Sequence, residues 1–158
     1  MEEILKKYSL LKNQNVSRET FLDFESFITM LQKKNEEINL ISKGSAKNEV
    51  IRVRHVIDSA QIIEFVDLNY NTITDIGTGG GMPGVIISIM IKNLKNSVKT
   101  NLYEKSHHKS SFLRKVSRDL SLNTEVIQKN IFEAQNIESG TIMARAFKPL
   151  PVILDLVH

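Results

Sequence analysis

The stretch "TDIGTGGGMPGVI", residues 74–86, is the part of the chain best suited to bind a ligand through its backbone. Five of the seven glycines fall within positions 77–84, with Asp75 ahead of them and Pro83 among them. Because glycine has no Cβ, such a loop lets the main chain approach a ligand closely and adopt positive φ. The strand-like "TITDI" precedes it and a helical pattern follows, so we predict a loop that cradles a nucleotide-like ligand between a strand and a helix.

A dinucleotide is one ligand that this loop could hold. Gly79, Gly81 and Gly84 satisfy the pattern G-x-G-x-x-G, and Glu104 follows 20 residues after Gly84. This register puts Pro83, which has no N–H, at the helix start that should bind the pyrophosphate. A dinucleotide-binding oxidoreductase therefore remains only the weaker alternative.

A second register uses the residues that the first leaves without a role. Asp75-x-Gly77-x-Gly79-x-Gly81, followed by Glu104 at the end of the next strand-like run, resembles motif I of the class I S-adenosylmethionine (AdoMet) methyltransferases. The resemblance implies that Gly77 makes room for the methionine part of AdoMet and that Asp75 lies near its ammonium group. It also implies that Glu104 accepts hydrogen bonds from both ribose hydroxyls. We favour this register.

The first 71 residues have helical periodicity and should form an N-terminal helical extension. Phe24, Phe27, Ile28 and Leu31 share one face of a helix over residues 17–37, for which Ser17 is a suitable N-cap. A second helical segment, "EVIRVRHVIDSAQIIEFV", covers residues 49–66. Its expected inward positions are Val50, Val53, Ile57 and Ile62 or Ile63.

Residues 72–158 should form an α/β domain that binds the cofactor. Strand-like and helix-like runs alternate there, which favours a parallel sheet covered by helices. The expected strands are "TITDI", "KTNLYE", "TEVIQ" and "TIMARA", and the expected helices are "PGVIISIMIKNL", "HHKSSFLRKVSRDLSL" and "PLPVILDLV".

Composition excludes several kinds of site. The chain has no cysteine, so disulfides, cysteine-ligated zinc and a thiol nucleophile are absent. Adjacent histidines on a helix point in different directions, so His107 and His108 do not indicate a metal site, and we predict none. The longest apolar run, "VIISIMI" at 85–91, is too short to span a bilayer. We expect a cytoplasmic protein without a membrane partner.

Four motifs together resemble the RsmG family, also called glucose-inhibited division protein B. They are "NLIS" at 39–42, "RHVIDSA" at 54–60, "DIGTGGGMPG" at 75–84 and "ARAFKPL" at 144–150. The resemblance covers almost the whole chain. It implies an AdoMet-dependent methyltransferase that modifies N7 of a guanine in 16S ribosomal RNA, either naked or in the small subunit. The alternative within this fold is an RNA-binding protein that no longer transfers a methyl group.

The resemblance also implies a fold and an assembly. Family members have a Rossmann-like sheet with several more strands after "ARAFKPL", so the α/β domain here should be C-terminally shortened, with strand order 3-2-1-4. The family implies a monomer. The strand "TIMARA" would then be a free sheet edge, through which copies of this chain could associate.

The family's AdoMet contacts fall on Gly77, Met82, Ile131, Phe132 and Arg145 of this sequence. Arg145 is also the candidate catalytic residue, because a guanidinium can hold a phosphate or orient the cofactor while N7 stays free for attack. A purely structural salt bridge from Arg145 to Asp75 or Glu104 is the alternative.

The candidate residues on the substrate side are Arg54, His55, Asp58, Lys43 and Lys47. His55 and Asp58 lie at i, i+3 on one helix face, where they could serve the substrate or brace the helical extension against the sheet. Basic residues also gather around these motifs and are expected to meet RNA phosphates: Lys33, Lys34, Lys43, Lys47, Arg52 and Arg54. Residues 72–158 hold 11 Lys and Arg against 7 Asp and Glu, whereas residues 1–71 hold 10 against 11.

Overall fold

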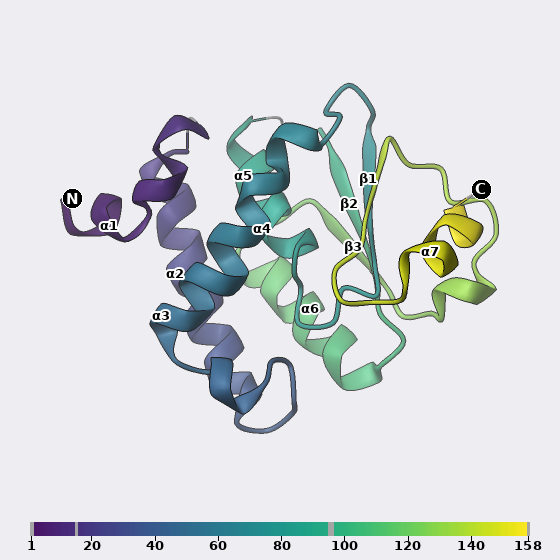
Figure 1. The fold of residues 1–158 in the computed structure, drawn as a ribbon, viewed down its shortest axis with the longest axis horizontal. Coiled ribbons are helices and arrows are strands. Elements are labelled where there is room, and N and C mark those ends of the chain that lie inside the picture. Colours follow the sequence, from purple (N-terminus) through teal and green to yellow (C-terminus); the bar gives the residue numbers. More distant parts are fainter. Residues whose placement is uncertain (1, 15, 95–96, 158) are drawn as a thin grey trace.

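A four-stranded parallel sheet forms one side of the molecule, and the N-terminal helices form the other (Figure 1). The computed structural model describes residues 2–14, 16–94 and 97–157. The strand order is β3-β2-β1-β4, as expected. The strands are β1 (Thr72–Ile76), β2 (Lys99–Tyr103), β3 (Thr124–Ile127) and β4 (Thr141–Met143). This architecture confirms the α/β prediction.

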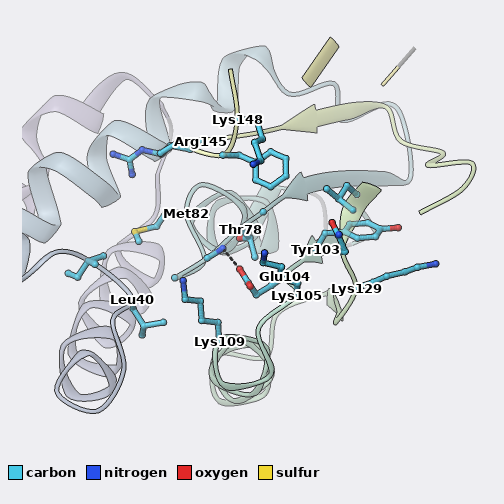
Figure 2. A pocket seen from close by; sticks show the side chains of 18 of the residues that line it. Leu40, Thr78, Met82, Tyr103, Glu104, Lys105, Lys109, Lys129, Arg145 and Lys148 are labelled. Carbon is cyan, nitrogen blue, oxygen red and sulfur yellow. Dashed lines mark hydrogen bonds between the residues drawn. The ribbon is translucent and has the colours of Figure 1, made fainter. Parts of the chain in front are cut away.

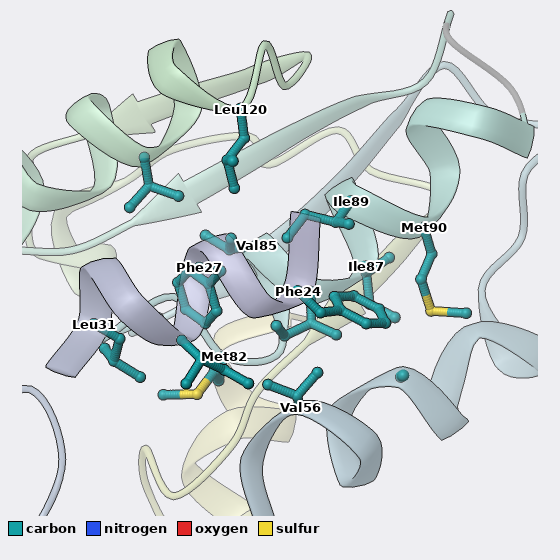
Figure 3. Close-up of a cluster of buried hydrophobic side chains, with 14 of the residues drawn as sticks. Phe24, Phe27, Leu31, Val56, Met82, Val85, Ile87, Ile89, Met90 and Leu120 are labelled. Atoms are coloured by element: carbon teal, nitrogen blue, oxygen red, sulfur yellow. The ribbon is translucent and has the colours of Figure 1, made fainter. Parts of the chain in front are cut away.

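Helix α5 (Gly84–Leu94) links the sheet to the N-terminal helices. Its residues 84–91 are all buried, as expected for a helix that is apolar on every side. It packs against the sheet and against α2 (Arg18–Asn35), where Phe24, Phe27 and Leu31 meet Val85 and Ile89 in one core (Figure 3). The extension and the α/β domain therefore share a hydrophobic core.

The helical character of the N-terminal extension is confirmed over its described residues. Ser17 caps α2 as expected, since its hydroxyl accepts a hydrogen bond of 3.2 Å from the N–H of Thr20. The remaining elements of the extension are α1 (Glu2–Lys7), η1 (Ser9–Gln14), η2 (Lys43–Ser45), α3 (Asn48–Ile51), η3 (Arg52–Ile57), α4 (Asp58–Ala60) and η4 (Gln61–Phe65).

The inward face of the second helical segment differs from the prediction only in part. Ile57 is buried, and Ile62 and Ile63 pack against the core, as expected. Val53 is 44% exposed, whereas Ile51 and Val56 are fully buried. The cause is η3, which is a turn of π-helix. A π turn hydrogen-bonds from residue i to i+5 and so shifts the phase of every side chain in it. The prediction assumed the 3.6-residue period of an α-helix throughout.

The remaining elements follow the predicted order with shifted ends. Helix α6 (His107–Asp119) buries Phe112 and Val116, and α7 (Leu150–Val157) ends the described chain. Pro83 precedes α5 and is not its first residue. Strand β4 ends at Met143 and does not reach residue 146, because the chain bends and Ala146 takes a positive φ of 48°. No described helix is both long and apolar enough to cross a membrane.

Candidate active site

A pocket of about 680 Å³ opens where the strands end at their carboxyl edge. Parallel sheets bind ligands at this edge, because the loops that leave neighbouring strands meet there. The glycine loop follows β1, residues 103–105 lie at the end of β2, and residues 129–132 and 145–148 follow β3 and β4. Figure 2 shows Glu104 in this pocket, with Met82 and Arg145 on one side of it and Tyr103 and Lys129 on the other. The volume lies in the range typical of pockets for small molecules.

The glycine loop has the backbone conformation that the sequence predicted. Gly77, Gly79 and Gly81 have φ values of 67°, 57° and 98°, in the left-handed region. A Cβ on Gly77 would overlap the ring of Phe147, which packs directly over this part of the loop. Gly77 therefore allows both the turn and the close approach of another group.

Asp75 lies beneath the loop and does not line the pocket. Its side chain is fully buried, and its Oδ2 accepts a hydrogen bond of 2.8 Å from the N–H of Gly84 at the start of α5. Burial raises the pKa of Asp75 to about 7, although the nearby Thr78 side chain and the hydrogen bond from the Gly84 N–H act against this rise. Asp75 thus joins β1 to α5, and the structure does not place it where it would meet a cofactor ammonium group.

Glu104 lines the pocket and faces the glycine loop. Its Oε2 accepts a hydrogen bond of 3.1 Å from the N–H of Gly79, and its Oε1 accepts one of 2.7 Å from the N–H of Ser106. The residue is 8% exposed. Two loops therefore hold one carboxylate at the end of β2, in the pocket that the glycine loop borders.

Met82, Ile131 and Phe132 line the pocket, as do Gly77, Gly79 and Arg145, whereas Gly81 does not. Met82 is 9% exposed and Ile131 is 3% exposed, so both offer apolar surface that is shielded from water. Phe132 is 46% exposed, and its ring stacks on that of Phe147 with a centroid distance of 6.0 Å and an interplanar angle of 21°. Sequence reasoning missed Phe147, although it stands in the quoted motif "ARAFKPL" and directly follows the predicted strand "TIMARA".

Arg145 connects the end of β4 to the π-helical turn η3. Its guanidinium forms an ion pair of 3.1 Å with Asp58 and donates a hydrogen bond of 2.8 Å to the carbonyl of Arg54. A third contact, of 3.2 Å, joins its Nη1 to Nδ1 of His55. The ion pair is therefore with Asp58 and not with Asp75 or Glu104, and the two motifs "RHVIDS" and "ARA" meet at this point.

Among the candidate RNA contacts, the structure separates surface residues from a buried one. Lys43, Lys47 and Arg54 are exposed. Arg52 is 4% exposed and forms ion pairs with Glu25 and Glu49, so its assignment to a phosphate-binding surface was wrong. The buried guanidinium of Arg52 is neutralised by these carboxylates and is not accessible to a ligand.

Four lysines that the sequence analysis did not select line the pocket, and we call them the rim lysines: Lys105, Lys109, Lys129 and Lys148. Lys105 and Lys129 directly follow predicted strands, and Lys148 lies in the motif "ARAFKPL", two residues after a third. Their position at the carboxyl edge of the sheet was the signal that could have identified them.

Comparison with known proteins identifies the family. A family model described as "GidB: rRNA small subunit methyltransferase G" matches residues 21–158. The chain belongs to the GidB family. It is 77% identical over 158 residues to the ribosomal RNA small subunit methyltransferase G of Pelagibacter ubique (strain HTCC1062), an alignment that covers all of this chain and 74% of the relative. The protein of the same name from Ruegeria pomeroyi is 34% identical over 144 residues, covering 91% of this chain and 69% of the relative.

Membership of the GidB family confirms the resemblance drawn from the four motifs and decides between the two registers of the glycine loop in favour of the methyltransferase. The pocket fits AdoMet on three structural grounds. The Gly77 backbone leaves no room for a Cβ, the Glu104 carboxylate faces the loop, and Met82 and Ile131 offer apolar surface. Among the residues that the structure describes, no group of three or more histidine, cysteine or acidic side chains could hold a metal ion.

Proposed function

We propose that this chain transfers a methyl group from AdoMet to N7 of a guanine in the 16S RNA of the small ribosomal subunit. The observation that carries the proposal is the pocket itself. A family-specific glycine loop and an opposed carboxylate lie in one cavity, in a chain 77% identical to a ribosomal RNA small subunit methyltransferase G. An RNA substrate of this kind would place its action in the cytoplasm.

On the cofactor side, Glu104 would hold the ribose and the backbone of Gly77 would border the methionine part. Met82, Ile131 and Phe132 would enclose the adenine and exclude water from the reacting groups. AdoMet, when bound, supplies an electrophilic methyl group on a sulfonium cation. Glu104 is already fixed by Gly79 and Ser106, so its carboxylate is positioned before the ligand arrives.

On the substrate side, the chemistry requires positioning more than proton transfer. N7 of guanine attacks through a lone pair and has no proton to lose, so no general base is needed. The chain must hold the base in line with the methyl group and keep water out. Arg145 and His55, which line the pocket, would form this side of the site. Arg54 and Asp58 do not line the pocket and would act through their contacts with Arg145.

RNA phosphates would meet basic residues around the pocket mouth. Lys43 and Lys47 lie on the extension, and the rim lysines lie at the carboxyl edge of the sheet. Charges on both sides suit a structured RNA that is recognised by its shape and phosphates.

Transfer of labelled methyl from AdoMet to small subunits that lack the modification tests this proposal. We expect label at a single guanine of 16S RNA, located by chain scission specific for N7-methylguanine. Glu104→Gln should weaken AdoMet binding in calorimetry, whereas the exposed control Glu138→Gln should not. RNA binding without methyl transfer would instead identify a chain that has kept the fold and no longer performs the reaction.

A further inference from the structure

His55 has an unused hydrogen-bonding atom at the active site. The residue lines the pocket, and its Nε2 is buried without a hydrogen-bond partner among the residues that the structure describes. A buried polar atom without a partner is destabilising, and native proteins rarely keep one unless a ligand or function requires it. A ligand atom of the right chemistry at Nε2 would remove this cost.

The contact with Arg145 fixes which nitrogen of His55 carries the proton. A guanidinium can only donate, so Nδ1, at 3.2 Å from Nη1 of Arg145, must accept. The single proton of a neutral imidazole then lies on Nε2. Burial lowers the pKa of His55, the positive charges of Arg145 and Arg54 lower it further, and Asp58 opposes them, so the ring stays neutral near pH 7. His55 consequently carries one N–H donor, on the buried Nε2 of a residue that lines the pocket.

The arrangement around Arg145 holds this donor in place. Arg145 is tied to Asp58 and to the carbonyl of Arg54, both from the same helical segment as His55. The π-helical turn η3 contains Arg54 and His55 and ends directly before Asp58. Turns of this kind are frequent at functional sites. Because its charge is already paired with Asp58, Arg145 acts here as a positioning residue.

The chemistry of guanine identifies the acceptor. Its Hoogsteen edge carries two acceptors, O6 and N7, and the reaction requires N7 to remain free. A bidentate arginine would occupy both atoms, whereas a single N–H can bind O6 alone. Adenine carries an amino group at the corresponding position, so two donors would face each other. A carboxylate of the cofactor is a poorer partner, because it would prefer a cation to a neutral imidazole.

We propose that the Nε2–H of His55 donates a hydrogen bond to O6 of the target guanine and thereby selects guanine over adenine while leaving N7 free. The inference rests on the proposed function and adds a specificity-determining residue to it. The same contact would orient the base, because O6 and N7 lie on one edge of the ring.

Two conservative variants separate this role from simple bracing of Arg145. In His55→Asn, the side-chain oxygen can replace Nδ1 as the acceptor for Arg145, but no donor remains at the position of Nε2. In His55→Gln, the longer side chain can place an N–H near that position. We expect His55→Asn to lower kcat/KM for small subunits about tenfold, and His55→Gln to stay within about threefold of the unchanged chain. His108→Ala, an exposed histidine on α6, is the control.

Binding and folding measurements accompany the kinetics. Calorimetry should give an AdoMet Kd for His55→Asn within about twofold of the unchanged chain, and thermal melting should show that the variant folds. Nitrogen-15 NMR of the ligand-free chain should show the His55 proton on Nε2. A proton on Nδ1 would overturn the proposal.

Three other outcomes would also count against it. If His55→Asn transfers normally and His55→Gln does not, His55 only braces Arg145. If His55→Asn weakens AdoMet binding about tenfold, the donor serves the cofactor and not the base. If the unchanged chain binds AdoMet but transfers no methyl group, both the proposed function and this inference fail. If the unchanged chain does transfer a methyl group, the proposed function holds whatever the variants show.

Discussion

At the scale of single residues, Gly77 is the position where the conformation and the expected ligand contact coincide. Its φ of 67° disfavours any side chain, and a Cβ there would overlap the ring of Phe147. We expect Gly77→Ala to lower the free energy of unfolding by about 1–3 kcal/mol. It should also weaken AdoMet binding at least tenfold, because the ring of Phe147 or the loop must shift into the pocket. Denaturant unfolding and calorimetry measure the two effects.

Gly44→Ala is the matched control for this change. No atom lies within 4 Å of the position that a Cβ on Gly44 would take, and the residue is exposed outside the pocket. We expect both its stability and its AdoMet affinity to stay near those of the unchanged chain. A Gly77→Ala chain that is destabilised yet binds AdoMet normally would assign Gly77 to the turn alone.

At the scale of elements, Asp75 links the end of β1 to the start of α5 and should make stability depend on pH. Its pKa rises to about 7 in the folded chain, whereas a free aspartate has a pKa near 4. Between these values the folded state keeps a proton that the unfolded state releases. The free energy of unfolding should therefore fall as pH rises from 4 to 8, by at most about 4 kcal/mol from this group.

Asp75→Asn tests this link, because an amide oxygen can still accept from the Gly84 N–H but the side chain cannot ionise. Denaturant unfolding measures the free energy of unfolding between pH 5 and pH 8. In the variant we expect this free energy to lack the fall that Asp75 causes in the unchanged chain. The control Asp155→Asn, at an exposed position, should keep the fall in the free energy of unfolding. An unchanged pH slope in Asp75→Asn would mean that the buried carboxyl group does not titrate in this range.

The elements also show how far the sequence determines this fold. The strand β1 was predicted with its observed ends, because "TITDI" is bounded by a polar turn and the glycine loop. The π turn at Arg52–Ile57 was not predictable from periodicity, since "RVRHVI" fits an α-helical pattern equally well. Residues in and next to this turn contact residues that are distant in the sequence, above all through the contacts of Arg145 with Asp58 and His55. Such pairings depend on the tertiary fold, so the motifs indicated the separate site residues but not how these residues meet.

At the scale of the whole molecule, the rim lysines surround the pocket with positive charge. Among the described residues, no ion pair engages any of the four. We expect the double variant Lys129→Ala/Lys148→Ala to bind small subunits more weakly. It should also reduce the slope of log affinity against log salt by about 0.7 for each phosphate that the variant no longer binds. Lys6→Ala, an exposed lysine on α1 far from the sheet, is the control (Figure 1).

A salt titration of binding therefore distinguishes phosphate contacts from other roles. Equal slopes for the double variant and the unchanged chain would place the RNA elsewhere on the surface. AdoMet binding should stay unchanged in the double variant, because the contacts assigned to the cofactor involve neither lysine.

The sheet edge at β4 and the neighbouring helix α7 form a surface through which copies of this chain could associate. In the described chain β4 pairs only with β1, and the helix that follows, α7, exposes Leu150 (66%), Leu154 (44%) and Val157 (37%). Open strand edges and clustered apolar side chains favour association between copies. We expect the apparent mass in light scattering to rise with protein concentration. Leu150→Lys/Leu154→Lys should reduce this rise, whereas Leu22→Lys on α2, which is 46% exposed, should not. A concentration-independent monomer would show that one short strand and one short helix are too small a surface to hold two copies together.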